Sequence, residues 1–320
     1  MESSRRGAGV TAAPDESAEP DPALECPVCA VDPDSPPTRV DADGRCESCG
    51  RMVPSGRDHL EVDLGQLAGV TDRGLRHERN EDAMALAVVP DQASPTVLAV
   101  ISDGVSTSPQ AQEASQIATQ AAARLLLTSL RRGEDAGEAS LAAVRQGHLA
   151  LSSLGSPGRN PSATYISAVA DSGGVTICWL GDSRAYWLET GPDSRRLTAD
   201  DSLAEEMVAR GEMAEAEALT SPQAHVITRW LGVEGSDPRA HLTHFEPPGP
   251  GVVLVCSDGL WNYQPEAAGL AELALPAALT EPLGALRTLL SFAIGAGGAD
   301  NITAVLIPLP LAPAAPDNSR

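Results

Sequence analysis

The 320-residue chain contains few aromatic and few basic residues, and it has no long apolar run. Phe, Trp and Tyr together make up 3% of the residues, so the core has to rest on the Ala, Val, Leu and Ile within the 42% apolar fraction. The 29 Gly and 26 Pro interrupt the chain often, which favours short elements. This composition argues against a helical bundle.

Basic side chains number 22 against 44 acidic ones, for a net charge of -22. That balance argues against a nucleic-acid-binding protein, because phosphate backbones select Lys and Arg. Divalent cations suit an acidic chain better. No stretch approaches the roughly 18 apolar residues of a membrane span, and the N-terminus lacks a signal-peptide region, so we expect a cytoplasmic protein. The sequence contains neither a P-loop nor a G-x-G-x-x-G motif, which argues against a kinase and against a dinucleotide-binding protein.

The ends of the chain differ in composition from its middle. Residues 1–24 hold almost no large apolar side chain and are predicted to be disordered. Residues 309–320 form a Pro-rich, polar sequence that predicts a flexible tail. A small cysteine-containing segment is expected at 25–58, and a large globular domain at 60–308.

Within the large domain, β-favouring apolar runs alternate with segments of helical periodicity. Strands are predicted at 84–89, 96–102, 164–170, 175–180, 185–188, 252–257 and 302–307. Helices are predicted from Ser108, as N-cap, to about Leu125, and at about 137–154, 202–211, 266–275 and 281–295. Strand pairs followed by helix pairs predict an α+β fold, a four-layer α-β-β-α sandwich of two antiparallel sheets flanked by helices.

Four cysteines near the N-terminus have the spacing of a structural zinc ribbon. They form two C-x2-C pairs separated by sixteen residues: Cys26, Cys29, Cys46 and Cys49. Two disulfides or a redox C-x-x-C are the alternatives, although no βαβ pattern surrounds the motif. A Zn2+ ion would stabilise a segment too small to have its own core. Zinc ribbons often bind nucleic acid, but the few arginines here stand among many acids, so a protein partner is favoured over a nucleic acid. Cys178 and Cys256 lie in apolar runs and are expected to be core residues.

Acidic motifs lie at the ends of several predicted strands. They are Asn80-Glu81-Asp82, Ser102-Asp103-Gly104, Ser257-Asp258-Gly259 and Ala299-Asp300-Asn301. Each can place a carboxylate in a common cleft, and crowded carboxylates are stabilised by a hard cation such as Mg2+ or Mn2+. A single Asp-Gly turn is weak evidence for a metal site, because Asp and Gly are ordinary turn residues. The ordered set of four motifs is much stronger evidence.

These motifs and others in the same order resemble the metal-dependent serine/threonine protein phosphatase family, type 2C. The additional motifs are Thr71 to Gly74, Ser162-Ala163-Thr164, Gly181 to Tyr186, Leu197-Thr198 and Val226 to Arg229. The resemblance covers roughly residues 65–307. It implies a β-sandwich with two Mn2+ or Mg2+ ions in a channel at one end, where a metal-activated water hydrolyses phosphoserine or phosphothreonine without a phosphoenzyme.

Carried over residue by residue, the resemblance implies a metal-ligand set. Asp103 would bridge both ions, and the carbonyl of Gly104 would bind one of them. Asp258 and Asp300 would hold the second ion, while Glu81 and Asp82 would serve the first ion directly or through water. A weaker third ion would use Asp182, which could instead cap a strand turn.

The sequence departs from the family pattern at three positions. His77 stands where the family has a phosphate-gripping Arg, so His77, Arg76 or Arg79 is the candidate phosphate contact. Val105-Ser106-Thr107 replaces a segment that in some members holds a His able to protonate the leaving group. Asn262 replaces an Asp ligand of the third ion.

Other polar residues are expected to be structural. Asp200 and Asp201 are predicted to begin a helix, where its dipole favours them. The isolated histidines are predicted to be packed or on the surface: His148, His225, His241 and His244.

The function expected from the resemblance is therefore that of a phosphoprotein phosphatase acting in the pathway of a cognate serine/threonine kinase. The alternative is a catalytically weak or inactive phosphatase-like interaction module, motivated by His77, Val105 and Asn262. Hydrolysis of a nucleotide or a small phosphate ester remains a third possibility.

Overall fold

The computed structural model describes residues 58–89, 94–155, 160–218, 221–232 and 238–311. The N-terminal 55 residues form a separate unit outside these ranges, so the predicted disordered segment and the four-cysteine segment are not described. Everything below concerns the described part of the unit that runs from Gly56 to Arg320.

Eleven strands in this part form two sheets in which every pairing is antiparallel. The first sheet has the order β1-β2-β11-β10-β7-β8, with bounds His59–Asp63, Ala68–Asp72, Ile302–Leu309, Gly251–Cys256, Arg184–Leu188 and Arg195–Arg196. The second has the order β3-β4-β5-β6-β9, with bounds Asp82–Val89, Thr96–Asp103, Tyr165–Asp171, Gly174–Leu180 and His241–Phe245.

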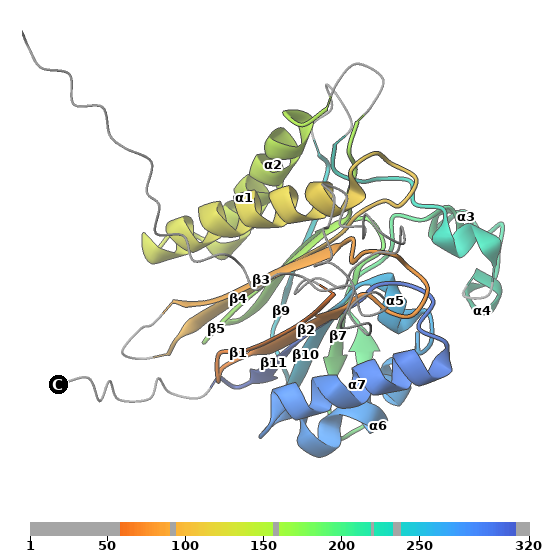
Figure 1. Ribbon diagram of the computed structural model, residues 1–320. Helices are drawn as coiled ribbons and strands as arrows, with labels where there is room; N and C mark the ends of the chain where they lie inside the picture. Colours follow the sequence, from red (N-terminus) through yellow and green to blue (C-terminus); the bar gives the residue numbers. More distant parts are fainter. Residues whose placement is uncertain (1–57, 90–93, 156–159, 219–220, 233–237, 312–320) are drawn as a thin grey trace, which may run out of the picture. The chain divides into compact units, whose positions relative to one another are not determined.

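Helices cover the outer face of each sheet, which gives the four layers visible in Figure 1. α1 (Ala111–Arg131) and α2 (Ala136–Ser152) pack on the second sheet, whereas α6 (Ala267–Ala278) and α7 (Pro282–Ala296) pack on the first. Short helices α3 (Leu203–Ala209), α4 (Glu215–Ala218), η1 (Pro222–His225) and α5 (Asp258–Trp261) lie in the connections. The predicted four-layer sandwich is confirmed.

The central strands of each sheet are mostly apolar, because both of their faces are covered. In β10, Val253 and Val255 enter the core between the sheets, while Val252, Leu254 and Cys256 enter the core under α6 and α7. Strand side chains alternate between faces, so a strand buried on both sides shows no polar period. A similar alternation in β4 divides its residues between the central core and the core under α1 and α2.

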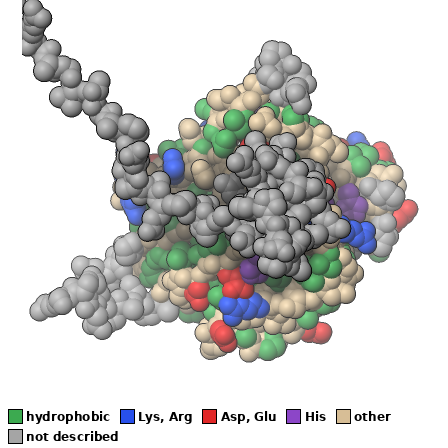
Figure 2. Space-filling view, viewed as in Figure 1, with side chains coloured by type: hydrophobic (Ala, Val, Ile, Leu, Met, Phe, Trp, Pro, Cys, Tyr) green, Lys and Arg blue, Asp and Glu red, His purple; other side chains and the backbone are tan. Residues whose placement is uncertain are grey.

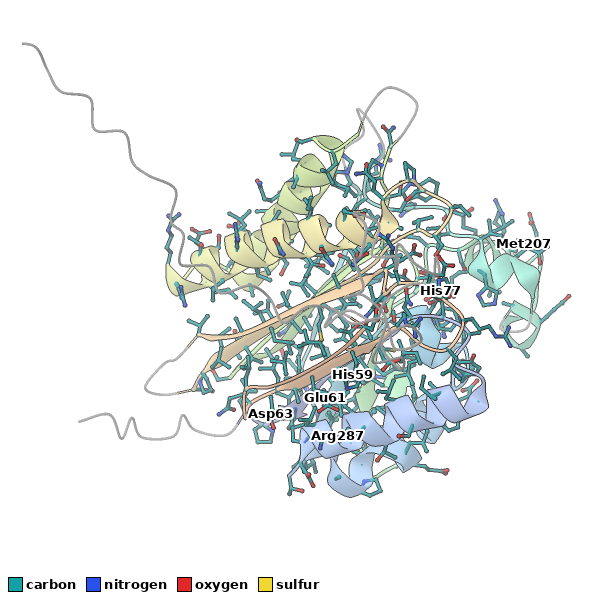
Figure 3. All side chains as sticks on the ribbon, in the orientation of Figure 1. His59, Glu61, Asp63, His77, Met207 and Arg287 are labelled. Carbon is teal, nitrogen blue, oxygen red and sulfur yellow. The ribbon has the colours of Figure 1, made fainter. Side chains whose placement is uncertain are left out.

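An ion pair on the surface links the edge strand to a helix. Arg287 on α7 donates to both carboxylate oxygens of Glu61 on β1, at 2.9 and 2.6 Å. Figure 2 shows acidic, basic and histidine side chains gathered on this face, and Figure 3 labels Glu61, Arg287, His59 and Asp63 there. None of the helices in the described ranges has both the length and the apolar character needed to cross a bilayer.

Two sequence predictions about helix starts are wrong. Ser108 does not cap α1, because its hydroxyl accepts a hydrogen bond from the Ser162 amide at 3.1 Å, and α1 begins later, after Gln110. Asp200 and Asp201 do not begin α3, whose N-cap is Ser202. Both aspartates have other partners, which are described below.

The pattern also missed or shortened some strands. β1 and β2 were not predicted, nor was β9, whose edge position leaves Leu242 and His244 exposed. β11 continues past the expected end at Ile307, because Pro308 and Leu309 still pair with Val252 and Gly251. Leu309 is buried and belongs to the domain, not to the tail.

Candidate active site

Four aspartates meet at one end of the two sheets. Asp82 begins β3 and Asp103 ends β4, and the two residues are direct cross-strand partners. Asp258 begins α5 immediately after β10, and Asp300 lies just before β11, the strand that pairs with β10. The loops and α5 that carry these groups lie together on the right of Figure 1. The fold therefore brings together the acidic motifs expected from the sequence.

Hydroxyl groups position these carboxylates and join the two sheets. The Ser257 hydroxyl donates to Asp82 Oδ2 at 2.8 Å and accepts from the Thr303 amide at 3.0 Å. On the other side of the cluster, the Asp103 amide donates to Thr164 Oγ1 at 3.0 Å. Nothing in the sequence motifs assigns a role to Ser257 or Thr303, because the partners of both hydroxyls lie far away along the chain.

Asn301 fixes the loop that carries Glu81. Its side-chain oxygen accepts from the Glu81 amide at 2.7 Å. Its side-chain nitrogen donates to the carbonyls of Arg73 and Arg79, at 2.8 and 3.0 Å. The residue after Asp300 thus holds the β2–β3 loop against the start of β11.

Both Asp-Gly motifs need a glycine because another backbone approaches closely. A Cβ on Gly104 would lie 2.3 Å from the carbonyl oxygen of Ala111, and one on Gly259 would lie 1.9 Å from that of Asn301. Real Cβ atoms do not tolerate such distances, so the positions after Asp103 and Asp258 exclude any side chain. These contacts bring the two aspartates toward one cleft.

The carboxyl groups are electrostatically strained when no cation is bound. Burial, followed by repulsion from the neighbouring carboxylates, raises the pKa of Asp82 from 3.8 to about 7. The pKa of Asp258 rises to about 7 for the same reasons, against opposing hydrogen bonds with Asn262 and Asp103. Burial, then the charges of nearby aspartates, raises the pKa values of Asp103 and Asp182 well above the ordinary range.

The donor set fits a divalent cation. The Oδ1 atoms of Asp82 and Asp258 are buried and have no hydrogen-bond partner. A hard cation would satisfy both oxygens and relieve the repulsion that raises the pKa values. Among the described residues no three His, Cys, Asp or Glu side chains form a ready cage for one ion. Mg2+ and similar ions use one or two carboxylates and keep several waters, so a direct cage of three side chains is not required.

The cluster opens into a cavity of about 630 Å3. Its acidic lining comes from Asp103, Asp182, Asp258 and Asp300, and Gly104 and Asn262 lie with them. The opposite part of the lining belongs to the segment after α4 and is formed by His225, Val226, Ile227 and Trp230. Asp82 is buried beneath this cavity and does not line it.

Asp182 and Asn262 both line the cavity. Asp182 is buried, and Asn262 donates from Nδ2 to Asp258 Oδ2 at 3.1 Å. The Asp182 backbone carbonyl accepts from the Trp261 indole at 2.9 Å. The Asp182 side chain therefore belongs to the acidic cluster, while its backbone anchors α5.

Glu81 and His77 lie at the rim of the cluster. Ser106 donates to Glu81 Oε2 at 2.6 Å. His77 Nε2 is 3.2 Å from Asp300 Oδ1, and its Nδ1 is 4.0 Å from Glu81 Oε2. Figure 3 shows His77 in the loop beside this end of the sheets. Arg76 is exposed and Arg79 is half-buried in the same loop, and of the three candidate phosphate contacts His77 is the one with a described contact to the acidic residues.

Asp200 and Asp201 hold Arg184 and Gly181, which flank the cavity-lining Asp182 along the chain. Asp200 accepts from Arg184 Nε and Nη2 at 3.0 and 2.7 Å in a fully buried ion pair. The Arg184 guanidinium lies 3.5 Å from the centroid of the Trp261 ring. Asp201 accepts from the Gly181 amide at 3.1 Å and lies 2.9 Å from His241 Nε2. Both carboxylates therefore have specific partners, which explains why neither begins α3.

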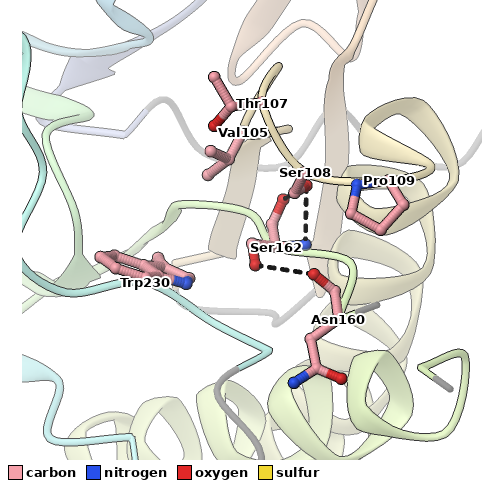
Figure 4. Close-up of a pocket in the computed structure, with 7 residues that line it drawn as sticks. All are labelled: Val105, Thr107, Ser108, Pro109, Asn160, Ser162 and Trp230. Carbon is pink, nitrogen blue, oxygen red and sulfur yellow. Dashed lines mark hydrogen bonds between the residues drawn. The ribbon is translucent and has the colours of Figure 1, made fainter. Parts of the chain in front are cut away.

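A second hollow of about 600 Å3 shares Val105, Thr107 and Trp230 with the acidic cavity. Figure 4 shows Trp230 facing Ser108 and Ser162 across it. Two hydrogen bonds fix Ser162 there. Its backbone amide donates to the Ser108 hydroxyl, and its own hydroxyl donates to the Asn160 carbonyl at 3.2 Å. Among the described residues, no charged side chain lines this second hollow.

The remaining sequence-predicted residues are structural or undescribed. Cys178 and Cys256 are buried free thiols, as expected. His148 is packed, with Nδ1 accepting from the Gly232 amide at 3.3 Å, whereas His244 is exposed. The candidate zinc ligands lie outside the described residues: Cys26, Cys29, Cys46 and Cys49.

Comparison with known proteins gives a consistent family. The profile of the protein phosphatase 2C family matches residues 73–282. A serine/threonine phosphatase from Listeria innocua is 28% identical over 255 residues, which cover 74% of this chain and 93% of the relative. The serine/threonine protein phosphatase PstP of Mycobacterium tuberculosis is 29% identical over 250 residues, covering 75% of this chain and 44% of PstP.

Solved structures agree. The PPM Ser-Thr phosphatase MsPP from Mycobacterium smegmatis, in complex with cacodylate, aligns with a TM-score of 0.64 and 27% identity, covering 77% of this chain and 99% of MsPP. The catalytic domain of PstP in complex with two manganese ions aligns with a TM-score of 0.59 and 25% identity, covering 75% of this chain and 96% of that domain. The chain therefore belongs to the protein phosphatase 2C family of serine/threonine protein phosphatases.

Proposed function

We propose that this protein hydrolyses phosphoserine and phosphothreonine in proteins at a dinuclear Mn2+ or Mg2+ centre built on the aspartate cluster. The observation that carries the proposal is the pair of buried carboxylate oxygens, Asp82 Oδ1 and Asp258 Oδ1, that have no hydrogen-bond partner. Buried charges require compensation, and a cation supplies it where four carboxylates repel one another. A phosphate ester needs the same positive charge in order to approach this acidic cavity.

Each acidic residue has a proposed role in holding the ions. Asp103 would be shared by both ions and the Gly104 carbonyl would bind one of them, while Asp258 and Asp300 would hold the second. Glu81 and Asp82 would serve the first ion directly or through water. When bound, the ions neutralise the phosphoryl oxygens and make a water molecule acidic enough to attack phosphorus. Ser257 and Thr164 keep the carboxylates of β3 and the backbone of β4 in place for this task.

A third ion is proposed to bind weakly. Asp182 and Asn262 line the same cavity, but an amide oxygen is a neutral ligand and supplies less charge than a carboxylate. Equilibrium dialysis with Mn2+ should therefore give two tightly bound ions for each chain and at most a weak third.

His77 is proposed to contact the substrate phosphate in place of an arginine, with Arg76 as the other candidate. The contact of His77 with Asp300 places its ring at the rim of the acidic cluster. His77→Ala should raise KM for a phosphothreonine peptide more than Arg76→Ala does. Equal effects of the two substitutions would contradict this assignment.

The four N-terminal cysteines are proposed to bind one structural Zn2+ and to form a protein-docking module. Thiolate ligands of this kind require a reducing compartment, which is consistent with a cytoplasmic enzyme that opposes a serine/threonine kinase. Metal analysis of the purified full chain should give one zinc per molecule, and Cys26→Ser with Cys29→Ser should remove it. A preparation that contains disulfides and no zinc would contradict the proposal.

Activity is tested with the purified, metal-stripped chain. Adding Mn2+ or Mg2+ should restore release of phosphate from p-nitrophenyl phosphate and from a phosphothreonine peptide. Failure to release phosphate at any metal concentration, with Mn2+ binding still detected by calorimetry, would instead favour the catalytically inactive interaction module. Activity on nucleotides alone would favour a small-molecule phosphatase.

A further inference from the structure

His225 is a polar side chain of the acidic cavity that has no assigned role. It ends the short helix η1 and lines the cavity together with Asp103, Asp182, Asp258 and Asp300. Its ring is exposed, so it can exchange protons with solvent. The sequence predicts a packed or surface histidine here, because His225 stands alone, without a His-Glu-x-x-His motif or a nucleophile beside it.

The position of the imidazole is fixed by the ring on which it stacks. His225 and Trp261 are nearly parallel, with an angle of 7° between the rings and 6.2 Å between their centroids. Trp261 is held by its hydrogen bond to the Asp182 carbonyl and by the guanidinium of Arg184. Because Trp261 and Asp258 belong to the same short helix, the stack places His225 relative to the metal-binding carboxylates.

The backbone after His225 is anchored as well. The Leu203 amide donates to the Val226 carbonyl at 2.8 Å, and the Thr228 amide donates to the Asp201 carbonyl at 2.7 Å. Ile227 forms a β-bridge with Ser202 between these two contacts. The segment is therefore tied to the residues that precede α3 and cannot swing freely away from the cavity.

Within the described lining of the cavity, His225 is the one imidazole. The other polar side chains are carboxylates, which the proposed ions engage, and hydroxyl or amide groups, which are poor acids. His77 does not line the cavity, and its Nε2 lies beside Asp300. No residue at Val105 to Thr107 can supply a proton by an imidazole either.

We infer that His225 is the general acid of the reaction and protonates the leaving oxygen of phosphoserine or phosphothreonine; this rests on the proposed phosphatase function. Water attacks phosphorus, and the bond between phosphorus and the Ser or Thr oxygen breaks. The electron pair of that bond stays on the departing oxygen, which takes the proton of the His225 imidazolium. The neutral imidazole then regains a proton from solvent, and the proton lost by the attacking water also passes to solvent.

Two substrates with different leaving groups test this assignment. A Ser or Thr alkoxide is a strong base and needs protonation as it departs, whereas p-nitrophenolate is stable as an anion. His225→Gln keeps a hydrogen-bond donor without a transferable proton, and His225→Phe keeps the stack on Trp261. Because general acids contribute about 10²–10⁴-fold, both variants should lower kcat for the phosphothreonine peptide by about 10²-fold or more, with kcat for p-nitrophenyl phosphate little changed.

The same assays separate this inference from the phosphatase proposal. His244→Gln, which changes an exposed histidine on β9 away from the cavity, is the matched control and should leave both activities unchanged. If both substrates slow equally in the His225 variants, or if neither slows, His225 is not the general acid even though the enzyme is a phosphatase. If the unmodified chain hydrolyses neither substrate with Mn2+, the phosphatase proposal itself fails.

Discussion

Asp82→Asn should stabilise the metal-free protein and remove its response to Mn2+. Asp82 is buried, its pKa is raised from 3.8 to about 7, and its Oδ1 has no partner. At about 1.36 kcal/mol per pH unit, that rise corresponds to a destabilisation of about 4 kcal/mol when the group is ionised. Because neighbouring carboxylates share the repulsion, we expect the neutral Asn to raise the free energy of unfolding by about 2–4 kcal/mol at pH 8.

The pH dependence has a definite sign. The unfolded chain releases the Asp82 proton near pH 3.8, whereas the folded, metal-free chain keeps it up to about pH 7. The folded state binds more protons between these values, so the contribution of Asp82 to stability falls as the pH rises and levels off above pH 7. The wild type in EDTA should therefore be less stable at pH 8 than at pH 5, and Asp82→Asn should reduce this difference.

Urea unfolding in EDTA and in Mn2+, at pH 5 and pH 8, measures these quantities. Glu272→Gln, on the exposed face of α6, is the control for removing one negative charge from the whole chain. Mn2+ at 100 times its dissociation constant should stabilise the wild type by about 2.7 kcal/mol, and the variant by much less. The explanation would be refuted if the variant were less stable than the wild type at pH 8 in EDTA and its pH dependence were unchanged. Repulsion between buried carboxylates would then not be what destabilises the metal-free protein.

Three further substitutions test the metal site and the residues that support it. Asp103→Asn should abolish Mn2+-dependent phosphate release while the far-UV circular dichroism is unchanged, and residual turnover near the wild-type rate would contradict the bridging role. Arg184→Met should lower the free energy of unfolding by about 3 kcal/mol, because it leaves the buried Asp200 carboxylate with only the longer ion pair to Arg196, at 3.8 Å. Arg287→Met, at an exposed pair, should change it little, and similar urea midpoints for the two variants would argue against this reasoning. Gly259→Ala should lower the melting temperature strongly because its Cβ would overlap a backbone carbonyl 1.9 Å away, while Gly249→Ala has no atom within 4 Å and should melt like the wild type.

Much of the architecture could be predicted because strands buried on both faces leave a clear pattern. The apolar runs that became β4, β5, β6, β10 and β11 were recognised within a few residues. The edge strands β1 and β9 were not, since their half-exposed faces mix polar and apolar side chains. The start of α1 was misplaced because the Ser108 hydroxyl bonds to Ser162, far away along the chain, and not to the helix.

The acidic motifs could be found in the sequence because each is local: an apolar strand, an aspartate and a tight turn. Their order along the chain was sufficient to indicate the metal-dependent phosphatase class. Only the tertiary structure decided the environment of each group. Asp82 is held by a serine 175 positions away, and Asp200 pairs with Arg184 instead of beginning a helix. His225 reaches the acidic cavity by stacking on Trp261. Sequence periodicity determines which face of an element is buried, but the packing of distant elements determines which side chains meet there.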